Sequence, residues 1–491
     1  MKNLYRRNVF IKYYLCTLIS FLIVFVCRLQ AEPINEQYRC SRFPVLSLNE
    51  GIQENSFQFS SDGKIFAYAV VENGKYRVMW NNTMGEPYNE ISALELSQSG
   101  LHLLYWGLKG TKLYLLYDHN AVGSWSGKTE NDLNSCWSMI SSNDRHWIAG
   151  ESSRSGKSFL LVDGIVQPDF KITASAVLSK NGQSWGYIGL KKNGTVVQIV
   201  NGNEIGNFTD YRHSWLDNRL ARMIIDDEGK IAAAVEPRPG GYQIRNGNDV
   251  IAKFGLVLYV TRTDLMFVQN SPEKANDSVE ISKRFISLSS LQYNNGHIAW
   301  IQNVDGTSHS DSAVVQEVIL DGKAIGPQNY PGMNSFLLQG ALEFAPNGNA
   351  IAFIGRDEMQ KWFVWSTKQF SSGYPYAYML QWSLNGEHIA FKTMKESDGT
   401  KQWFYVVDNV PLSSYEDVHG GRFCADDSIF CYFYTKGEKL ALVIDKIEHG
   451  SFDKLIAVSP PAERPDALLW YVVKEGSELV RLEINKTKPV K

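Results

Sequence analysis

Hydrophobic and polar positions along this chain follow a short phrase that recurs many times. The phrase reads apolar residue, Ser, any residue, Asp or Asn, Gly, and then an apolar strand with a small residue near its end. Its first copy is residues 59–68, and it returns with modest variation at 96–105, 140–149, 178–187, 344–353, 382–391 and 423–432. An Asp-Gly or Asn-Gly pair gives the backbone a positive φ without a Cβ penalty. Each phrase therefore predicts two strands joined by a tight hairpin.

The phrases are spaced by roughly forty residues, and the intervening residues also look like strands. A third segment is rich in aromatic and β-branched residues, and a polar connector with one more short strand completes the unit. Four strands per repeat without helical periodicity is typical of a β-propeller blade. Looser copies near Gly229, Gly296 and residues 466–473 bring the count to ten repeats, and a worn copy at residues 256–268 would make eleven. The sequence predicts an all-β protein of the β-propeller class.

Ten or eleven blades exceed the four to eight with which propellers commonly close into one ring. We therefore expect two rings, an N-terminal propeller at residues 32–269 and a C-terminal propeller at residues 279–491. The linker between them is expected at residues 270–278, which are polar and contain a proline unfavourable to strands. A single large ring is the alternative.

The repeated phrase resembles the short propeller repeats of TolB-type periplasmic proteins and of prolyl-oligopeptidase-type propeller domains. The resemblance extends over residues 57–485 and lies in the motif. It implies a WD-like repeat protein with a propeller fold. Two features depart from TolB, because no α/β domain is recognised ahead of the repeats and the repeats are more numerous. No α/β-hydrolase pattern accompanies them either, so the resemblance implies no peptidase activity.

The first residues differ in kind from the repeats. Lys2, Arg6, Arg7 and Lys12 precede an apolar run at residues 15–26, the layout of a secretory signal peptide, here residues 1–31. The alternative is a membrane anchor formed by residues 15–26, although twelve apolar residues are few against the roughly twenty of a spanning helix. Both interpretations predict export to the periplasm, the extracellular space or the lumen of the secretory pathway.

Charge narrows the range of partners. The leader contains five cations and no acidic residue, so its removal changes the formal net charge from -3 to -8. No basic stripe is present that would neutralise phosphates. We expect no nucleic-acid partner, and no membrane contact beyond the leader.

Four cysteines follow the leader, in a compartment where disulfides form: Cys40, Cys136, Cys424 and Cys431. Residues 425–427 predict a three-residue hairpin loop between the last two. In that register Cys431 lies three residues beyond the position opposite Cys424, an offset of about 10 Å that a disulfide does not span. We expect both to be buried thiols, and a Cys40–Cys136 pair stays open.

Motifs of catalysis and metal binding are sparse. The Gly-Lys-Ser at residues 156–158 lies between strands, so it does not form a phosphate-binding loop ahead of a helix. His102, His146 and His388 occupy one position of the repeat on separate blades, which favours a satisfied strand-edge role over metal ligation. We predict no catalytic residue, no metal site and no cofactor. The alternative is a carbohydrate-active enzyme whose carboxylates the sequence does not reveal.

Aromatic residues in the blade connectors provide the candidate binding site. A ring recurs eight residues before the phrase and is expected to pack between blades, at Tyr88, Phe170, Phe336, Tyr374 and Tyr415. Trp125, Tyr330 and Tyr376 fall outside that register, on segments bounded by glycine and proline, and are the candidate binding residues. The sequence thus predicts an exported, non-enzymatic scaffold that binds a protein or a glycan through its connector face.

Overall fold

The computed structural model of the chain describes residues 32–33, 38–151, 160–167, 171–172, 176–179, 181–191, 196–208, 223–225, 229, 232–238, 241–246, 249–255, 285–294, 297–304, 315–321, 323–326, 342–356, 361–397, 399–424, 427, 429–461 and 468–486. The predicted leader, the predicted linker at 270–278 and Tyr330 lie outside these residues. Within them, no helix has the length and hydrophobicity needed to cross a membrane.

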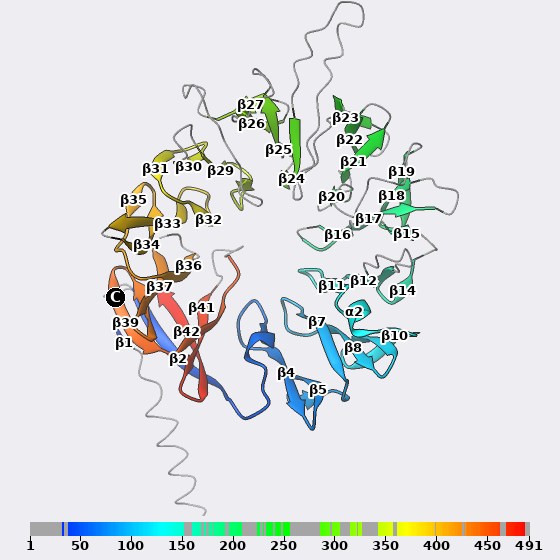
Figure 1. Cartoon of the computed structure of the whole chain (residues 1–491), viewed down its shortest axis with the longest axis horizontal. Coiled ribbons are helices and arrows are strands. Elements are labelled where there is room, and N and C mark those ends of the chain that lie inside the picture. Colours follow the sequence, from blue (N-terminus) through cyan, green and yellow to red (C-terminus); the bar gives the residue numbers. More distant parts are fainter. Residues whose placement is uncertain are drawn as a thin grey trace, which may run out of the picture. The chain divides into compact units, whose positions relative to one another are not determined.

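The described residues form ten antiparallel sheets, most of them four-stranded meanders in chain order (Figure 1). This confirms the predicted all-β, β-propeller class with its four-stranded repeats. The number of rings stays a prediction. The chain divides into two compact units: a central unit, Gly51–Val418, and a terminal unit made of Met1–Glu50 with His419–Lys491.

The central unit contains eight sheets, and among its described residues the helices are η1 (Glu54–Ser56, 3-10) and α2 (Glu130–Leu133). Its strands, sheet by sheet, are β3 (Gln58–Phe59), β4 (Phe66–Glu72), β5 (Lys75–Trp80) and β6 (Thr83–Met84); β7 (Glu90–Leu96), β8 (Leu103–Lys109), β9 (Lys112–Tyr117) and β10 (Asn120–Ser126); β11 (Cys136–Ile140), β12 (Trp147–Glu151), β13 (Leu160–Val162) and β14 (Ile165–Val166); β15 (Lys171–Ile172), β16 (Val177–Leu178), β17 (Trp185–Leu190), β18 (Val196–Val200) and β19 (Asn203–Phe208); β20 (Met223–Ile225), β21 (Ala232–Arg238), β22 (Gly241–Asn246) and β23 (Asp249–Gly255); β24 (Phe285–Asn294), β25 (His297–Val304), β26 (Val315–Leu320) and β27 (Lys323–Ile325); β28 (Leu342–Phe344), β29 (Ile351–Arg356), β30 (Trp362–Ser366) and β31 (Phe370–Tyr374); β32 (Tyr378–Trp382), β33 (Ile389–Ser397), β34 (Thr400–Val407) and β35 (Val410–Pro411).

The terminal unit contains two sheets. Its strands are β36 (Val418–Phe423, whose first residue belongs to the central unit), β37 (Phe430–Lys436), β38 (Lys439–Ile444) and β39 (Ile447–Phe452) in one sheet, and β1 (Glu32–Pro33), β2 (Tyr38–Ser47), β42 (Glu478–Lys486), β41 (Leu469–Glu475) and β40 (Lys454–Val458) in the other. In the second sheet the N-terminal strand β2 pairs with β42 from Tyr38–Lys486 to Ser47–Glu478. The final repeat expected at residues 466–473 is therefore a real blade, and the chain's N-terminal segment contributes two of its five strands, β1 and β2.

The serine of the phrase is buried in its turn and holds that turn closed. In the β32–β33 turn the Ser383 amide donates to the His388 carbonyl at 3.0 Å, and the His388 amide donates to Ser383 Oγ at 2.9 Å. Asn385 Oδ1 accepts from Ser383 Oγ at 2.8 Å and from the Glu387 amide at 2.7 Å. Turns with the same backbone bond begin at Ser60, Ser97, Ser141 and Ser179. The Ser and Asp/Asn positions are therefore required by backbone hydrogen bonding inside the turn.

A histidine and an aspartate then tie this turn to the turn that ends the third strand. His388 Nδ1 lies 2.6 Å from Asp408 Oδ2, while Asp408 Oδ1 accepts from the Ile389 amide at 3.0 Å. Asp408 has φ +49°, a left-handed conformation that Asp tolerates better than most residues. The same pairing recurs at His102–Asp118, His146–Asp163 and His297–Asp321. His102, His146 and His388 thus have hydrogen-bond partners at strand edges, as expected.

Neighbouring blades touch through these same turns. A Cβ on Gly386, which has φ +68°, would lie 2.9 Å from the Ala345 Cβ in the preceding blade's turn. Glycine is thus needed here both for its conformation and for close approach. The recurrent aromatic ring packs as expected at Tyr88, which contacts Tyr105 and Tyr114 of the following sheet edge-on. Phe170 and Phe336 lie outside the described residues.

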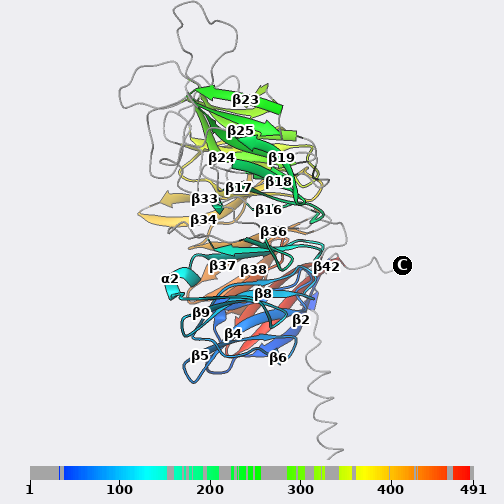
Figure 2. The ribbon, with the colours of Figure 1, turned by 90° about the vertical axis from the view of Figure 1, so that its right-hand side faces the viewer.

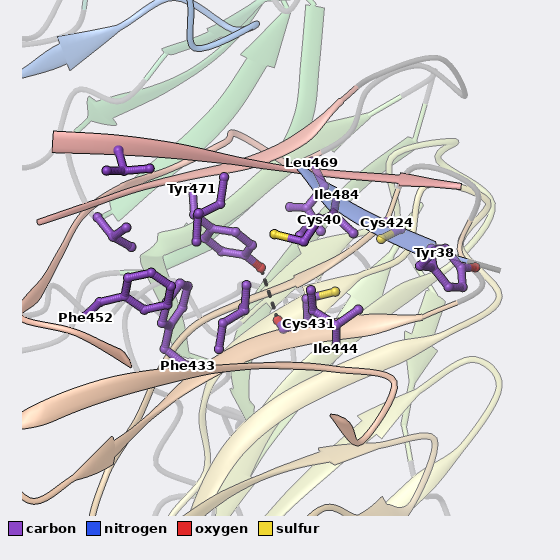
Figure 3. Packing of buried hydrophobic residues seen from close by; sticks show 14 residues of the cluster. Tyr38, Cys40, Cys424, Cys431, Phe433, Ile444, Phe452, Leu469, Tyr471 and Ile484 are labelled. Atoms are coloured by element: carbon purple, nitrogen blue, oxygen red, sulfur yellow. Dashed lines mark hydrogen bonds between the residues drawn. The ribbon is translucent and has the colours of Figure 1, made fainter. Parts of the chain in front are cut away.

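The core of the terminal unit contains three of the cysteines (Figure 3). Cys40 on β2 lies in one hydrophobic cluster with Cys424 and Cys431, and the Tyr471 hydroxyl donates to the Cys431 carbonyl at 3.3 Å. All three are buried. Cys424 and Cys431 are buried thiols, which confirms the expectation for them, and Cys136 in the central unit is also a buried thiol. The predicted loop length was wrong. The Cys424 amide donates to the Ile429 carbonyl, so the loop has four residues and Cys431 lies two positions further along, not three.

Substituting Asp408 tests the hydrogen bonds by which its carboxylate holds the phrase turn, which we call the turn lock. We expect Asp408→Ala to lower the free energy of unfolding by about 1–3 kcal/mol, because the Ile389 amide loses its acceptor and a left-handed Ala is strained. Asp408→Asn should retain most of the stability. In the β15–β19 sheet Asn201 already performs this role, with its Oδ1 accepting from the Trp185 amide at 2.8 Å. Urea denaturation measures both variants, and equal losses for Ala and Asn would contradict the assigned backbone bond.

Candidate functional site

Antiparallel pairing places the locked turns at one end of each sheet and the connectors at the other. In the β32–β35 sheet, the turn before β33 and the turn at Asp408 share one end, and the β33–β34 hairpin shares the other with the two blade connectors. We call the latter the connector end. Figure 2 shows α2, which lies in the connector before β11, and the β33–β34 hairpin projecting to the same side of the view.

The second strand of a sheet holds the incoming connector in place with one register position. Five residues past the end of the phrase turn, Thr393 Oγ1 donates to the Tyr376 carbonyl. At the equivalent position of β8, Gly107 leaves room for the Tyr88 ring, which a Cβ would approach to 2.5 Å. At the equivalent position of β12, the Glu151 carboxylate accepts a hydrogen bond from the Lys128 ammonium group. The connector end is thus anchored by a different chemistry in each blade.

Tyr376 lies in the connector between β31 and β32, as the sequence predicted, and is 49% exposed. Its ring stacks on Trp362, with centroids 6.0 Å apart and an interplanar angle of 19°. Trp362 is buried, and the Arg356 guanidinium lies 5.2 Å from its ring centroid. An exposed ring supported in this way has little rotamer freedom to lose on binding.

Met379 lies beside Tyr376 at the start of β32 and is 46% exposed. It occupies a β-bulge, where the register shifts between Tyr378 and Gln381, and has φ +56°. A left-handed conformation costs a residue with a Cβ about 1–2 kcal/mol. Met379 lies three residues before the first residue of its phrase, and at the equivalent position in β36 Gly420 has φ +58°. No pattern in the sequence predicted this bulge, which turns an apolar side chain outward where a glycine would relieve the strain.

A buried ammonium group lies next to Tyr378, the residue that precedes Met379. Lys392 pairs with Tyr378 across β32 and β33, and only 6% of its side chain is exposed. Its Nζ is 2.5 Å from Asp417 Oδ1 and 2.7 Å from the Val418 carbonyl oxygen. It also lies 5.0 Å from the Trp403 ring centroid and 5.4 Å from that of Tyr378. Sequence reasoning missed this residue, although aligning the repeats places a lysine among apolar residues.

The other two candidate residues do not join this group. Trp125 lies within strand β10, paired with Leu113, so its predicted place in a connector was wrong. Its ring is 5.5 Å from that of Trp106 and is partly buried in the cluster between two blades. Tyr330 lies outside the described residues. Of the three residues, Tyr376 has the exposed connector position that the binding prediction requires.

A second charged group lies at the connector end of the β11–β14 sheet. Lys128 Nζ is 2.9 and 2.7 Å from the two carboxylate oxygens of Glu151, which is fully buried, and 3.7 Å from Asp132 Oδ1. Burial raises the pKa of Glu151, whereas the Thr129 amide lowers that of Asp132. The Lys128 ammonium group contacts both carboxylates, whereas the two carboxyl groups of a glycosidase stand about 5 Å or more apart with sugar between them. This pair is therefore arranged as an ion pair with Lys128.

Glu343 on strand β28 is the other perturbed carboxyl group. Burial raises its pKa from an ordinary 4.5 to about 7, a value within the working range of a general acid. Metal chemistry has no comparable candidate, since no group of three or more His, Cys, Asp or Glu in the described ranges is arranged to hold an ion.

Comparisons with known proteins leave the family open. No protein-family model matches the chain. Among curated proteins, formate-dependent phosphoribosylglycinamide formyltransferase of Hydrogenovibrio crunogenus is 26% identical over 145 residues, which is 30% of this chain; the matched segment spans only 29% of that enzyme's length.

Solved structures with a similar arrangement of strands include propeller domains. A eukaryotic initiation factor has a TM-score of 0.44 at 10% identity and covers 84% of this chain and 91% of its own. The WD40 domain of SCAP from fission yeast (TM-score 0.32, 10% identity, 90% and 98% covered) and the β-propeller domain of Cps50 (Swd1) from Myceliophteria thermophila (0.27, 11%, 74% and 99%) are also similar. Similarity at this level does not bear on function. The fold class rests on the sheets of this chain.

Glu343 gives the protein a predictable pH dependence. Because the folded state binds this proton more tightly than the unfolded chain, the associated stability is full below about pH 4.5 and is lost as the pH rises through about 7. We expect Glu343→Gln to match the native protein near pH 4 and to exceed it by about 1–3 kcal/mol at pH 8. Urea unfolding of both proteins across this range is the measurement. A constant difference at all pH values would contradict the raised pKa.

Proposed function

We propose that this chain is an exported, non-enzymatic propeller scaffold that binds a protein partner through the connector end of the β32–β35 sheet. The observation that carries the proposal is the pair of exposed side chains, Tyr376 and Met379, presented by a stacked tryptophan and by a strained bulge. Fixed aromatic and methionine side chains are enriched at protein interfaces and supply much of their binding energy.

The two ends of the sheet support this choice of surface. The turn end uses its polar side chains on its own backbone, as Asp408 and Ser383 do. At the connector end the bulge at Met379 costs conformational energy and exposes an apolar side chain. Strain of this kind persists where the surrounding structure enforces it, and it clusters at functional sites.

Two variants on the connector end and one on the turn end test the binding surface. We expect Tyr376→Ala and Met379→Gly to weaken capture of the partner at least about tenfold, because each removes interface area of the kind that forms hot spots. Met379→Gly should also raise thermal stability, since glycine accepts φ +56° without strain. The matched control is Val410→Ala. Val410 is 59% exposed on β35, next to the locked turn of the same sheet, and its loss should leave capture unchanged.

The measurement is quantitative affinity capture from the host's secreted and envelope fractions, with a glycan array in parallel. The proposal requires a protein that native chain and Val410→Ala enrich and that both connector-end variants lose. Equal capture by all four proteins would refute it. Binding to sugars that Tyr376→Ala alone abolishes, with no protein enriched, would assign the surface to a glycan instead.

Export is tested separately by sequencing the N-terminus of the protein purified from its native host. Because the basic start and short apolar run have the layout of a cleaved signal, we expect the mature chain to begin near Glu32. Met1 retained on membrane-bound protein would favour the anchor formed by residues 15–26.

A further inference from the structure

One register position distinguishes strand β33 from the other second strands. This position lies four residues past the end of the phrase turn, and in β33 it is occupied by Lys392. In six other sheets the equivalent residue is uncharged: Ala69, Trp106, Gly150, Ile188, Ile354 and Phe433. The fold therefore does not need a cation here. A buried ion pair is often no more stabilising than apolar residues of similar volume, because the charges lose their hydration.

Lys392 links the elements that surround the exposed pair Tyr376 and Met379. Its ammonium group contacts the ring of Tyr378, which lies between Tyr376 and Met379 in the sequence, at the start of β32. On the outgoing side it binds Asp417 and the Val418 carbonyl, the end of the connector after β35. The same connector is tied to the third strand, because the Trp403 amide donates to the Tyr415 carbonyl at 2.7 Å and the Tyr415 amide donates to the Trp403 carbonyl at 2.9 Å.

The next residue along the strand secures the incoming connector. Thr393 is fully buried, and its hydroxyl group donates to the Tyr376 carbonyl. Successive side chains of a strand point to opposite faces of its sheet. Lys392 and Thr393 therefore fix one connector each, on either side of the strand, so that this short segment of β33 determines the geometry of both.

We infer that Lys392 is a positioning residue for the binding surface formed by Tyr376 and Met379, retained at some cost in stability because it fixes Tyr378, the residue before Met379, and ties it to the Asp417–Val418 connector. This inference rests on the proposed function. Lys392 touches no partner itself, and its effect passes through the groups that it holds.

The test is Lys392→Met, which keeps the length of the side chain and removes its charge. Asp417 is left without its ammonium partner, but its side chain is 38% exposed and becomes hydrated. We expect the melting temperature to stay constant or rise, while amide exchange in residues 412–418 accelerates about tenfold and partner affinity falls by a similar factor. Lys392→Arg should restore part of the affinity, since it keeps the cation and can still reach the carboxylate.

Ile188→Met is the matched control, because Ile188 is buried at the same register position of β17. It should leave exchange in residues 412–418 and partner affinity unchanged. Unchanged exchange in Lys392→Met, or a fall in melting temperature that matches the loss of affinity, would overturn the positioning role. If Tyr376→Ala abolishes capture and Lys392→Met does not, this inference alone fails. If Tyr376→Ala leaves capture intact, the proposed function fails whatever Lys392 does.

Discussion

Side-chain oxygens that bind the backbone of the phrase turn are the interaction on which every blade depends. A tight hairpin leaves amides that its own carbonyls cannot all satisfy, and burying them unpaired would cost more than the hydrogen bonds return. Ser383 and Asn385 satisfy two of these amides within the turn, and Asp408 satisfies a third from the end of the next hairpin. Because the aspartate reaches across strands, it couples two hairpins that would be only marginally stable alone.

This coupling determines where the chain can vary. The locked turns also contact one another between blades, as the close approach of Gly386 to Ala345 shows, so a change at that end affects two sheets. At the connector end each sheet has only one incoming connector to anchor. A cleft for the Tyr88 ring, an ion pair at Glu151 and a hydroxyl group at Thr393 are three different solutions. Variation in these anchors changes the surface without disturbing the lock.

The fold could be predicted because the residues that hold the phrase turn recur in a short, local sequence pattern. Ser, Asp or Asn, and Gly recur at fixed spacing, and each is required by the hydrogen bonding or backbone conformation of one turn. The candidate site is less legible for the opposite reason. The bulge at Met379 has no local signature, and Trp125 seemed to lie in a loop because glycines flank it, although its ring packs on Trp106 from within a strand. The extra loop residue after Cys424 escaped prediction in the same way, since turn length is set by pairing across the sheet.

Lys392 can be recognised as unusual only when the repeats are aligned with one another. Within its own strand the residue is unremarkable, because β33 also contains Lys395. Superimposed on the other repeats it stands in a column of alanine, glycine, aliphatic and aromatic residues, where an ionised group needs a partner. The structure supplies that partner from Asp417, which precedes the next blade and shares no motif with the phrase. In a repeat protein, a charge that interrupts an apolar column and takes its partner from a connector is therefore detected by comparing the repeats and not from one repeat alone.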